Sequence, residues 1–131
     1  MEILAFAAAH QAVLADAGGV TTDGFPMTSC HVESFPAQLN LPLVLAVHTA
    51  TGGEWGPRIY LRAKSPAGER VGFLEMAWEW PDPPGATDKY RVFAPALPLE
   101  LSAPGVYSIG LYADFRAAEP EFSFPLPFLQ A

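Results

Sequence analysis

Three histidines and one cysteine are the side chains of this sequence best suited to bind a transition metal. They are His10, His31, His48 and Cys30, and imidazole and thiolate groups are common zinc ligands. Cys30 and His31 are adjacent, however, and neighbouring residues of a strand point to opposite faces. His10 and His48 lie in separate segments, without Cys-x-x-Cys or His-x-x-x-His spacing. We therefore predict no metal site.

Catalysis would need a nucleophile beside a base, or two carboxylates across a cleft. The sequence has no Gly-x-Ser-x-Gly turn. Glu75 and Glu79 share one face of a predicted strand, but Arg58 offers them a cross-strand partner. Asp82 and Asp88 bracket a proline-rich loop that lacks the oxygen spacing of a calcium site. We predict no catalytic residue and no cofactor.

Exposed tryptophans stack on sugars and anchor protein contacts, and the sequence contains three tryptophans. Trp78 and Trp80 fall on the same side of an alternating segment as Leu74, so we predict that they pack in the core. Trp55 stands within residues 52–57, where no alternation would bury it. Trp55 is therefore the one candidate for a surface or ligand-binding residue, although a loop tryptophan more often closes the end of a β-sandwich.

The charge pattern argues against partners that carry phosphate. The chain has 14 acidic and 7 basic residues, and residues 1–57 contain no lysine or arginine. Nucleic acid or an anionic membrane would be repelled by that half. We find no apolar run of about 20 residues and no signal-peptide pattern, and one cysteine allows no internal disulfide. We expect a cytoplasmic protein with no nucleic-acid partner and no membrane partner.

The elements that would position these side chains are short strands. Fourteen prolines and eleven glycines interrupt the chain, and alternating apolar and polar runs lie between them. A chain of 131 residues suits one domain with its own core. We predict that residues 1–131 form a single all-β domain, an antiparallel β-sandwich that is immunoglobulin-like or related, with about 7 to 9 strands and little or no helix.

The clearest element is a hairpin over residues 58–80, with its turn at residues 65–68. Opposite charges would meet on the solvent face if Arg58 stood opposite Glu75. The same register would pair Ile59 with Leu74 on the core face.

The last strand carries two prolines at alternate positions, Pro125 and Pro127. Alternate residues of a strand point their N–H groups to the same side, and proline has none. Both missing donors therefore fall on one rim. We predict an edge strand whose core side is built on Phe122, Phe124, Leu126 and Phe128. A dimer would then form through a sheet face or through another edge.

The first 18 residues fit either a helix or strands. They are rich in helix formers, and Gly18-Gly19 would end a helix. The alternative is a strand over residues 3–9, a hairpin around residues 16–19 and a further strand from Val20. We prefer the strands, because tertiary context commonly overrides propensity in an all-β chain.

Three parts of the chain combine apolar strands with glycine or proline turns: residues 13–20, residues 35–47 and residues 94–107. In these parts the chain resembles a family of small uncharacterised bacterial single-domain β-sandwich proteins, a domain of unknown function. The resemblance implies the sandwich fold and a strand at the amino terminus. It implies no activity and no site residues.

Three functions remain open. The first is a non-enzymatic module that forms a homo-oligomer or docks on another protein, because 50% of the residues are hydrophobic and only 16% are charged. The second is a small-ligand or carbohydrate binder that uses Trp55. The third is an enzyme of unrecognised type with a pocket near His10, His31 or His48. We rank them in this order.

Overall fold

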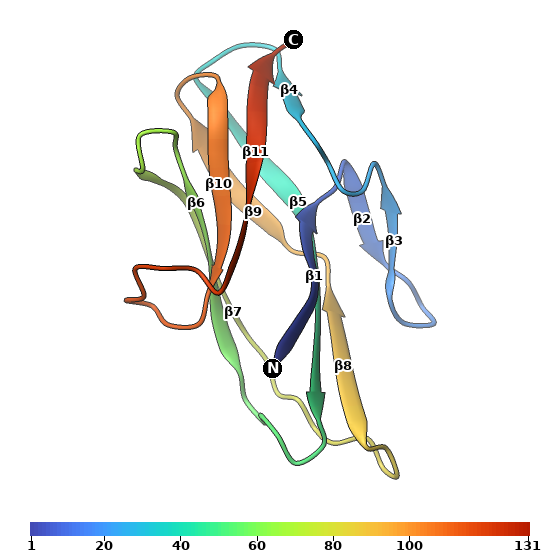
Figure 1. Ribbon diagram of the computed structural model, residues 1–131. Coiled ribbons are helices and arrows are strands. Elements are labelled where there is room, and N and C mark those ends of the chain that lie inside the picture. Colours follow the sequence, from blue (N-terminus) through green and yellow to red (C-terminus); the bar gives the residue numbers. More distant parts are fainter.

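All 131 residues are described by the computed structural model, which contains eleven strands and no helix. The strands are β1 (Glu2–Ala8), β2 (Gln11–Leu14), β3 (Val20–Asp23), β4 (Cys30–Val32), β5 (Ala37–Ala50), β6 (Arg58–Lys64), β7 (Arg70–Ala77), β8 (Asp88–Phe93), β9 (Ala96–Leu101), β10 (Gly105–Tyr112) and β11 (Phe122–Gln130) (Figure 1). The all-β class is confirmed, but the predicted number of strands is too low, because several segments divide into short strands. The chain contains no helix that could cross a membrane.

The first sheet is built around β5, a strand of 14 residues. β1 pairs with one side of its second half, and β8 pairs with the other side. β9 pairs with the first half of β5, and the Leu43 N–H donates to the Pro95 carbonyl (2.8 Å) between β8 and β9. Inward residues of β5 such as Leu45 and Val47 are fully buried, as their alternation predicts.

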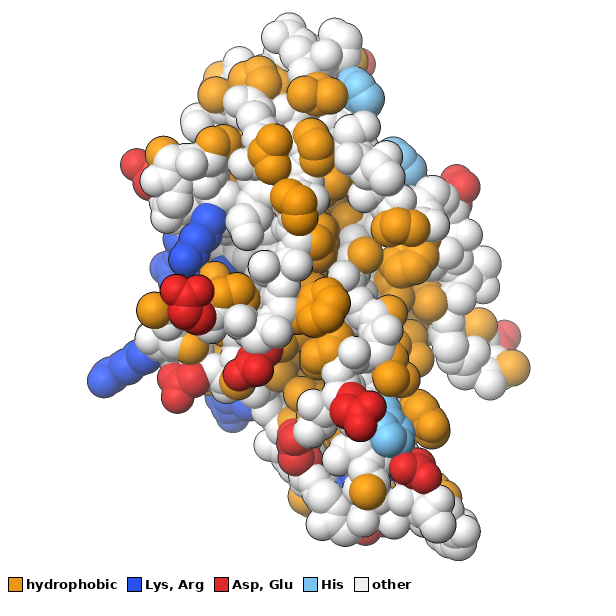
Figure 2. All heavy atoms as spheres, in the orientation of Figure 1, with side chains coloured by type: hydrophobic (Ala, Val, Ile, Leu, Met, Phe, Trp, Pro, Cys, Tyr) orange, Lys and Arg blue, Asp and Glu red, His pale blue; other side chains and the backbone are white.

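The second sheet has the strand order β4-β11-β10-β6-β7. Its pairs are antiparallel except one, because β4 runs parallel to β11. The predicted purely antiparallel arrangement is therefore wrong at this pair. β4 and β11 are far apart in the chain, so no hairpin turn fixes their relative direction. Lysine and arginine side chains gather on the β6–β7 side of the molecule (Figure 2).

β11 is not the edge strand that we predicted. It pairs with β10 over most of its length and with β4 over residues 128–130. The direction predicted for its prolines is confirmed. The N–H of Ala131 donates to the carbonyl of Val32, the last residue of β4 (2.9 Å), so the nitrogen atoms of Pro125 and Pro127, at alternate positions, also face that side. Pairing with β4 begins only beyond the prolines, where N–H donors are present again.

The β6–β7 hairpin keeps its predicted faces in a different register. Arg58 pairs with Ala77, and Ile59 pairs with Met76, so β7 is shifted by two positions from the prediction. The connection is longer than the four-residue turn that we expected, and a bulge lies beside it. Because side chains alternate with a period of two, this shift leaves the residues on their predicted faces up to the bulge, between Ile59 and Ala63 of β6 and between Gly72 and Met76 of β7. Arg58 still forms an ion pair with Glu75, now diagonally.

The two sheets face each other across one core of 19 buried residues (Figure 1). Leu126 and Phe128 of β11 belong to it, whereas Phe122 at the start of the strand is 44% exposed. Trp80 belongs to the core and Trp78 packs against it, as predicted. Near the start of β10, the Tyr107 hydroxyl donates to the Ala103 carbonyl (2.7 Å), which ties the strand to the turn before it.

The amino-terminal segment consists of strands, and the preference for strands over a helix is confirmed. β1 joins the first sheet, and β2 and β3 form a separate two-stranded hairpin. Gly18 and Gly19 lie in its turn with φ of 95° and 78°, which glycine adopts without strain.

Candidate functional site

The outward face of the first sheet changes character halfway along β5. Near the start of β5 the outward residues are Gln38 and Asn40, which are exposed. Past the middle of the strand they are Val44 and Ala46, followed by His48. An antiparallel sheet with one solvated face normally carries polar side chains on that face. The apolar half of this face is therefore built to be covered.

The neighbouring strands extend the apolar half of the sheet. In the pairing register, Ala7 of β1 stands opposite Val44, and Val92 of β8 stands opposite Ala46. The outward residues of this region form what we name the apolar face: Ala5, Ala7, Val44, Ala46, Tyr90 and Val92. Three of these side chains are alanines, so another surface can approach the sheet closely.

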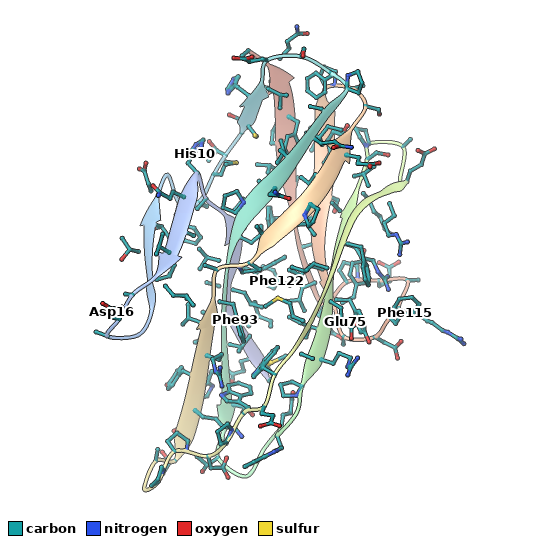
Figure 3. The ribbon with its side chains drawn as sticks, turned by 180° about the vertical axis from the view of Figure 1, so that it is seen from behind. His10, Asp16, Glu75, Phe93, Phe115 and Phe122 are labelled. Atoms are coloured by element: carbon teal, nitrogen blue, oxygen red, sulfur yellow. The ribbon has the colours of Figure 1, made fainter.

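The β2–β3 hairpin covers only part of the apolar face. β2 contacts β5, and Val44 is buried. A groove of about 340 Å³ remains between the hairpin and β8, lined by Leu14, Ala15, Gly18, Gly19, Tyr90, Arg91 and Val92. Figure 3 shows the hairpin standing beside the sheet, with His10 at its base and Asp16 at its tip. Leu14 is 53% exposed and Tyr90 is 63% exposed, so both banks of the groove remain open to a partner.

A polar margin limits the apolar face at its lower end. His48 Nε2 lies 2.8 Å from Asp88 Oδ1, and the His48 ring packs against Tyr90 with 4.7 Å between centroids. The Thr87 hydroxyl donates to the other Asp88 oxygen (2.8 Å). These hydrogen bonds, first from Thr87 and then from His48, lower the pKa of the Asp88 carboxyl. With Glu2 3.8 Å from His48 Nδ1, this margin is anionic.

Trp55 lies in the β5–β6 loop and is 59% exposed. Its carbonyl accepts a hydrogen bond from the Trp80 N–H (2.6 Å), which joins this loop to the segment after β7. Trp55 lines none of the four cavities. Its exposure therefore agrees with the sequence, while a role in ligand binding stays a prediction.

Beneath Trp55 the structure holds a buried lysine, Lys89, which sequence analysis had not singled out. Its Nζ donates to the Glu54 carbonyl (2.8 Å) and the Trp80 carbonyl (2.6 Å), and it lies 3.0 Å from Asp82 Oδ1. These contacts take up its three donor positions. The one signal in the sequence was that Lys89 shares its side of β8 with Phe93. The constellation holds two loops together and leaves no free group for chemistry.

The remaining candidates for metal or catalytic chemistry are dispersed. In β4, Cys30 packs against the core and His31 is exposed, on opposite faces as predicted. Burial raises the pKa of the Cys30 thiol. His10 packs against Gly24 at the base of the hairpin. No group of three histidine, cysteine, aspartate or glutamate side chains is arranged to hold a metal ion, and no histidine lines a cavity.

The outward face of the second sheet is also partly covered, in this case by the β10–β11 loop. Arg62 donates to the carbonyl groups of Ala117 (2.8 Å) and Phe115 in this loop. Phe115 packs edge-on against Tyr60 and Phe73 (5.7 and 6.0 Å between centroids). This loop and the β2–β3 hairpin lie on opposite sides of the molecule (Figure 3).

Comparison of the sequence with protein-family models and with curated proteins finds no match. The resemblance to small bacterial β-sandwich proteins therefore stays a prediction.

Proposed function

We propose that this chain is a non-enzymatic interaction module that self-associates through its apolar face. The observation that carries the proposal is the outward half of β5, where Val44 and Ala46 replace the polar pattern of Gln38 and Asn40 in the same strand. Covering such a surface is favourable by roughly 25 cal/mol for each Å² of apolar area removed from water. The hairpin provides only part of that cover.

A second copy of the chain suits the remaining surface. Two-fold symmetry would bring the apolar face of each copy against the other, so that Leu14 and Tyr90 of one protomer meet the groove beside the hairpin of its partner. β11 does not offer an alternative route, because Pro125 and Pro127 leave its free rim without N–H donors.

The proposed fold is an immunoglobulin-like sandwich, and two observations support it. One is that β4 belongs to the second sheet, where it pairs in parallel with the last strand. The other is the hydrogen bond from the Tyr107 hydroxyl to a carbonyl four residues earlier, which resembles the tyrosine corner of such domains. The single half-buried cysteine suits a reducing compartment such as the cytoplasm.

Replacement of Leu14 by arginine tests the proposed interface. We expect Leu14→Arg to weaken self-association at least about ten-fold, because it places a charge in an apolar contact. Sedimentation equilibrium or light scattering over a concentration series measures the dissociation constant.

Val106→Arg is the matched control, since Val106 is 54% exposed on β10 of the other sheet and the change in net charge is the same. A wild-type chain that stays monomeric at high micromolar concentration would contradict the proposal. Equal weakening of self-association by the two substitutions would show that the interface does not lie on the apolar face.

A further inference from the structure

Two adjoining cavities lie where β5, β7 and β9 meet, beside the first half of β5 and away from the apolar face. Their volumes are about 600 Å³ and about 540 Å³, within the range of small-molecule sites, roughly 300–1,000 Å³. Gln38, Val71 and Glu100 line both cavities, so the two form one continuous groove, which we name the β9 groove. Figure 3 shows the first half of β5 and β9 side by side, with β7 next to β9.

The strands β7 and β9, which border the groove, are open edges of their sheets. β9 pairs only with β5, and β7 pairs only with β6. No backbone hydrogen bond outside the ladders joins β7 to β9, although the two strands lie against each other. The N–H and C=O groups on the free side of each strand therefore have no partner strand. Such groups need water or a ligand as a hydrogen-bond partner.

Polar side chains of the groove are unbonded as well. Gln38 stands opposite Glu100 in the β5–β9 ladder, and Asn40 follows Gln38 on the same face of β5. Neither these three side chains nor that of Arg70 forms a hydrogen bond or an ion pair within the chain. At the lower end of the molecule, by contrast, the polar groups bond to one another. The groove thus presents amide, carboxylate and guanidinium groups whose donors and acceptors are all free.

The β7 side of the groove is apolar. Val71 packs against the core, and Phe73 lines the second cavity. The ring of Phe73 is fixed by contacts with the rings of Tyr60 and Phe115 (6.1 and 6.0 Å between centroids). The Arg70 guanidinium lies 5.2 Å from the centre of the Phe73 ring. An aromatic ring on one side and amide groups on the other suit a sugar, which has apolar C–H faces and a rim of hydroxyl groups.

Charge and space restrict the class of ligand. The groove holds Glu69, Arg70 and Glu100, so it has no excess of positive charge for a phosphate or a sulfate, and the chain as a whole has a charge of −7. A polypeptide strand that paired with both β7 and β9 would need about 10 Å between them, twice the spacing of neighbouring strands. A Cβ atom on Gly72 would lie 2.7 Å from the Pro98 carbonyl oxygen, so no strand fits there.

We propose that the β9 groove binds a neutral oligosaccharide. Hydroxyl groups, which both donate and accept, would bond to Gln38, Asn40 and the free main-chain groups of the two edges. One sugar ring would lie against Phe73 in the second cavity, and the next unit would occupy the first cavity beside Arg70. The site does not involve Trp55 and does not depend on the proposed self-association.

Titration of the isotope-labelled protein with cellotriose, mannotriose and triacetylchitotriose, followed by the chemical shifts of backbone amides, tests the proposal. These neutral trisaccharides differ in the configuration and substitution of their hydroxyl groups. We expect at least one of them to shift the amides of Gln38, Val71 and Glu100 with a dissociation constant of about 5 mM or below. The same trisaccharide is expected to bind at least about three-fold more tightly than its monosaccharide, because it spans both cavities.

An acidic sugar, sialyllactose, and a capped tripeptide of valine and threonine are the counterparts in this titration. Both are expected to bind more weakly than the neutral trisaccharide. Absence of shifts at these amides with all three neutral sugars would overturn the proposal. Tighter binding of sialyllactose would overturn the neutral class of ligand, and tighter binding of the tripeptide would indicate a polypeptide in place of a sugar.

Gln38→Ala and Asn40→Ala test the two amides of the groove. Each substitution is expected to weaken trisaccharide binding about two- to ten-fold, as for the loss of one or two hydrogen bonds. The unfolding midpoint is expected to stay unchanged, because both side chains are exposed. Gln11→Ala is the matched control, since Gln11 is an exposed amide on β2 that lines no cavity. Unweakened binding in Gln38→Ala and Asn40→Ala, or an equal loss in Gln11→Ala, would overturn the site.

Discussion

Single residues join the loops at the lower end of the molecule, and Lys89 has the central place among them. Its side chain is 1% exposed and its ammonium group lies 5.8 Å from the centre of the Trp55 ring. A buried lysine is tolerated because carbonyl groups and Asp82 satisfy its donors. Lys89 and Trp55 therefore form a structural connection between the β5–β6 and β7–β8 loops.

Asp82 makes this connection sensitive to acid. A hydrogen bond from Lys89, followed by one from the Gly52 N–H, lowers the pKa of the Asp82 carboxyl below its ordinary value of 3.8. A lowered pKa in the folded state stabilises the fold above the unfolded value, and this stability is lost as the pH falls through the folded pKa. We expect the free energy of unfolding to fall as the pH drops below about 4, and to fall less steeply in Asp82→Asn.

Urea unfolding at a series of pH values measures this effect. Asp88→Asn is the comparison variant, because the pKa of Asp88 is also lowered, by Thr87 and His48. Identical pH profiles for the wild type and Asp82→Asn would show that the contact with Lys89 contributes nothing to acid stability.

The candidate sites could be predicted from single residues only in part. The exposure of Trp55 followed from its loop, because no alternation could bury it. Leu14 and Tyr90 could not be recognised, because their importance depends on a hairpin that folds back over β5, a contact between segments remote in sequence. The one available signal was the apolar run of residues 41–47, which is typical of a strand covered on both faces.

At the scale of elements, β7 and β9 approach each other so closely that one glycine is required. A Cβ atom on Gly72 would lie 2.7 Å from the Pro98 carbonyl oxygen and 2.7 Å from Leu99 Cδ2. β9 belongs to the first sheet and β7 to the second, and no ladder joins them. Gly72 therefore sets how closely the two sheets approach along this side.

Gly72→Ala is expected to destabilise the fold by about 1–3 kcal/mol, because the backbone oxygen of Pro98 cannot move aside without shifting β9. Gly56→Ala is the control, since a Cβ atom there has no neighbour within 4 Å, and we expect a change within about 0.5 kcal/mol. Thermal or urea unfolding measures both. A Gly72→Ala variant as stable as the wild type would show that β9 can shift away from β7 without loss of stability.

The buried side of a strand could be predicted where apolar and polar residues alternate. The pairing of strands could not be predicted, because it depends on partners remote in the sequence. The inward side of β6 followed from the period of two, which survives even the shift of β7 by two positions. The parallel β4–β11 pair did not follow, because three residues around Cys30 contain no information about a partner almost 100 positions away. The prolines of β11 showed which rim was blocked but not that pairing resumes at Phe128.

For the whole molecule, net charge opposes the proposed self-association. Each copy carries a charge of −7, and Glu2 and Asp88 lie at the margin of the apolar face. Salt screens such repulsion, with a screening length of about 10 Å at 0.1 M. We expect the dissociation constant of the dimer to decrease about two- to ten-fold when the ionic strength rises from about 20 mM to about 300 mM. Sedimentation equilibrium at both ionic strengths checks this, and weaker association at high salt would indicate an interface held by ion pairs.

The position of β5 also has a consequence in time. Its partners β8 and β9 begin roughly 40 residues after β5 ends at Ala50. A ribosome that adds about 5–20 residues per second leaves this side of β5 unpaired for several seconds. During that interval β6 and β7 are already available to the inner face of β5, whereas only the β2–β3 hairpin has been made to cover its outer face. The hairpin on the outer face of β5 is thus available to shield the nascent chain before the first sheet can be completed.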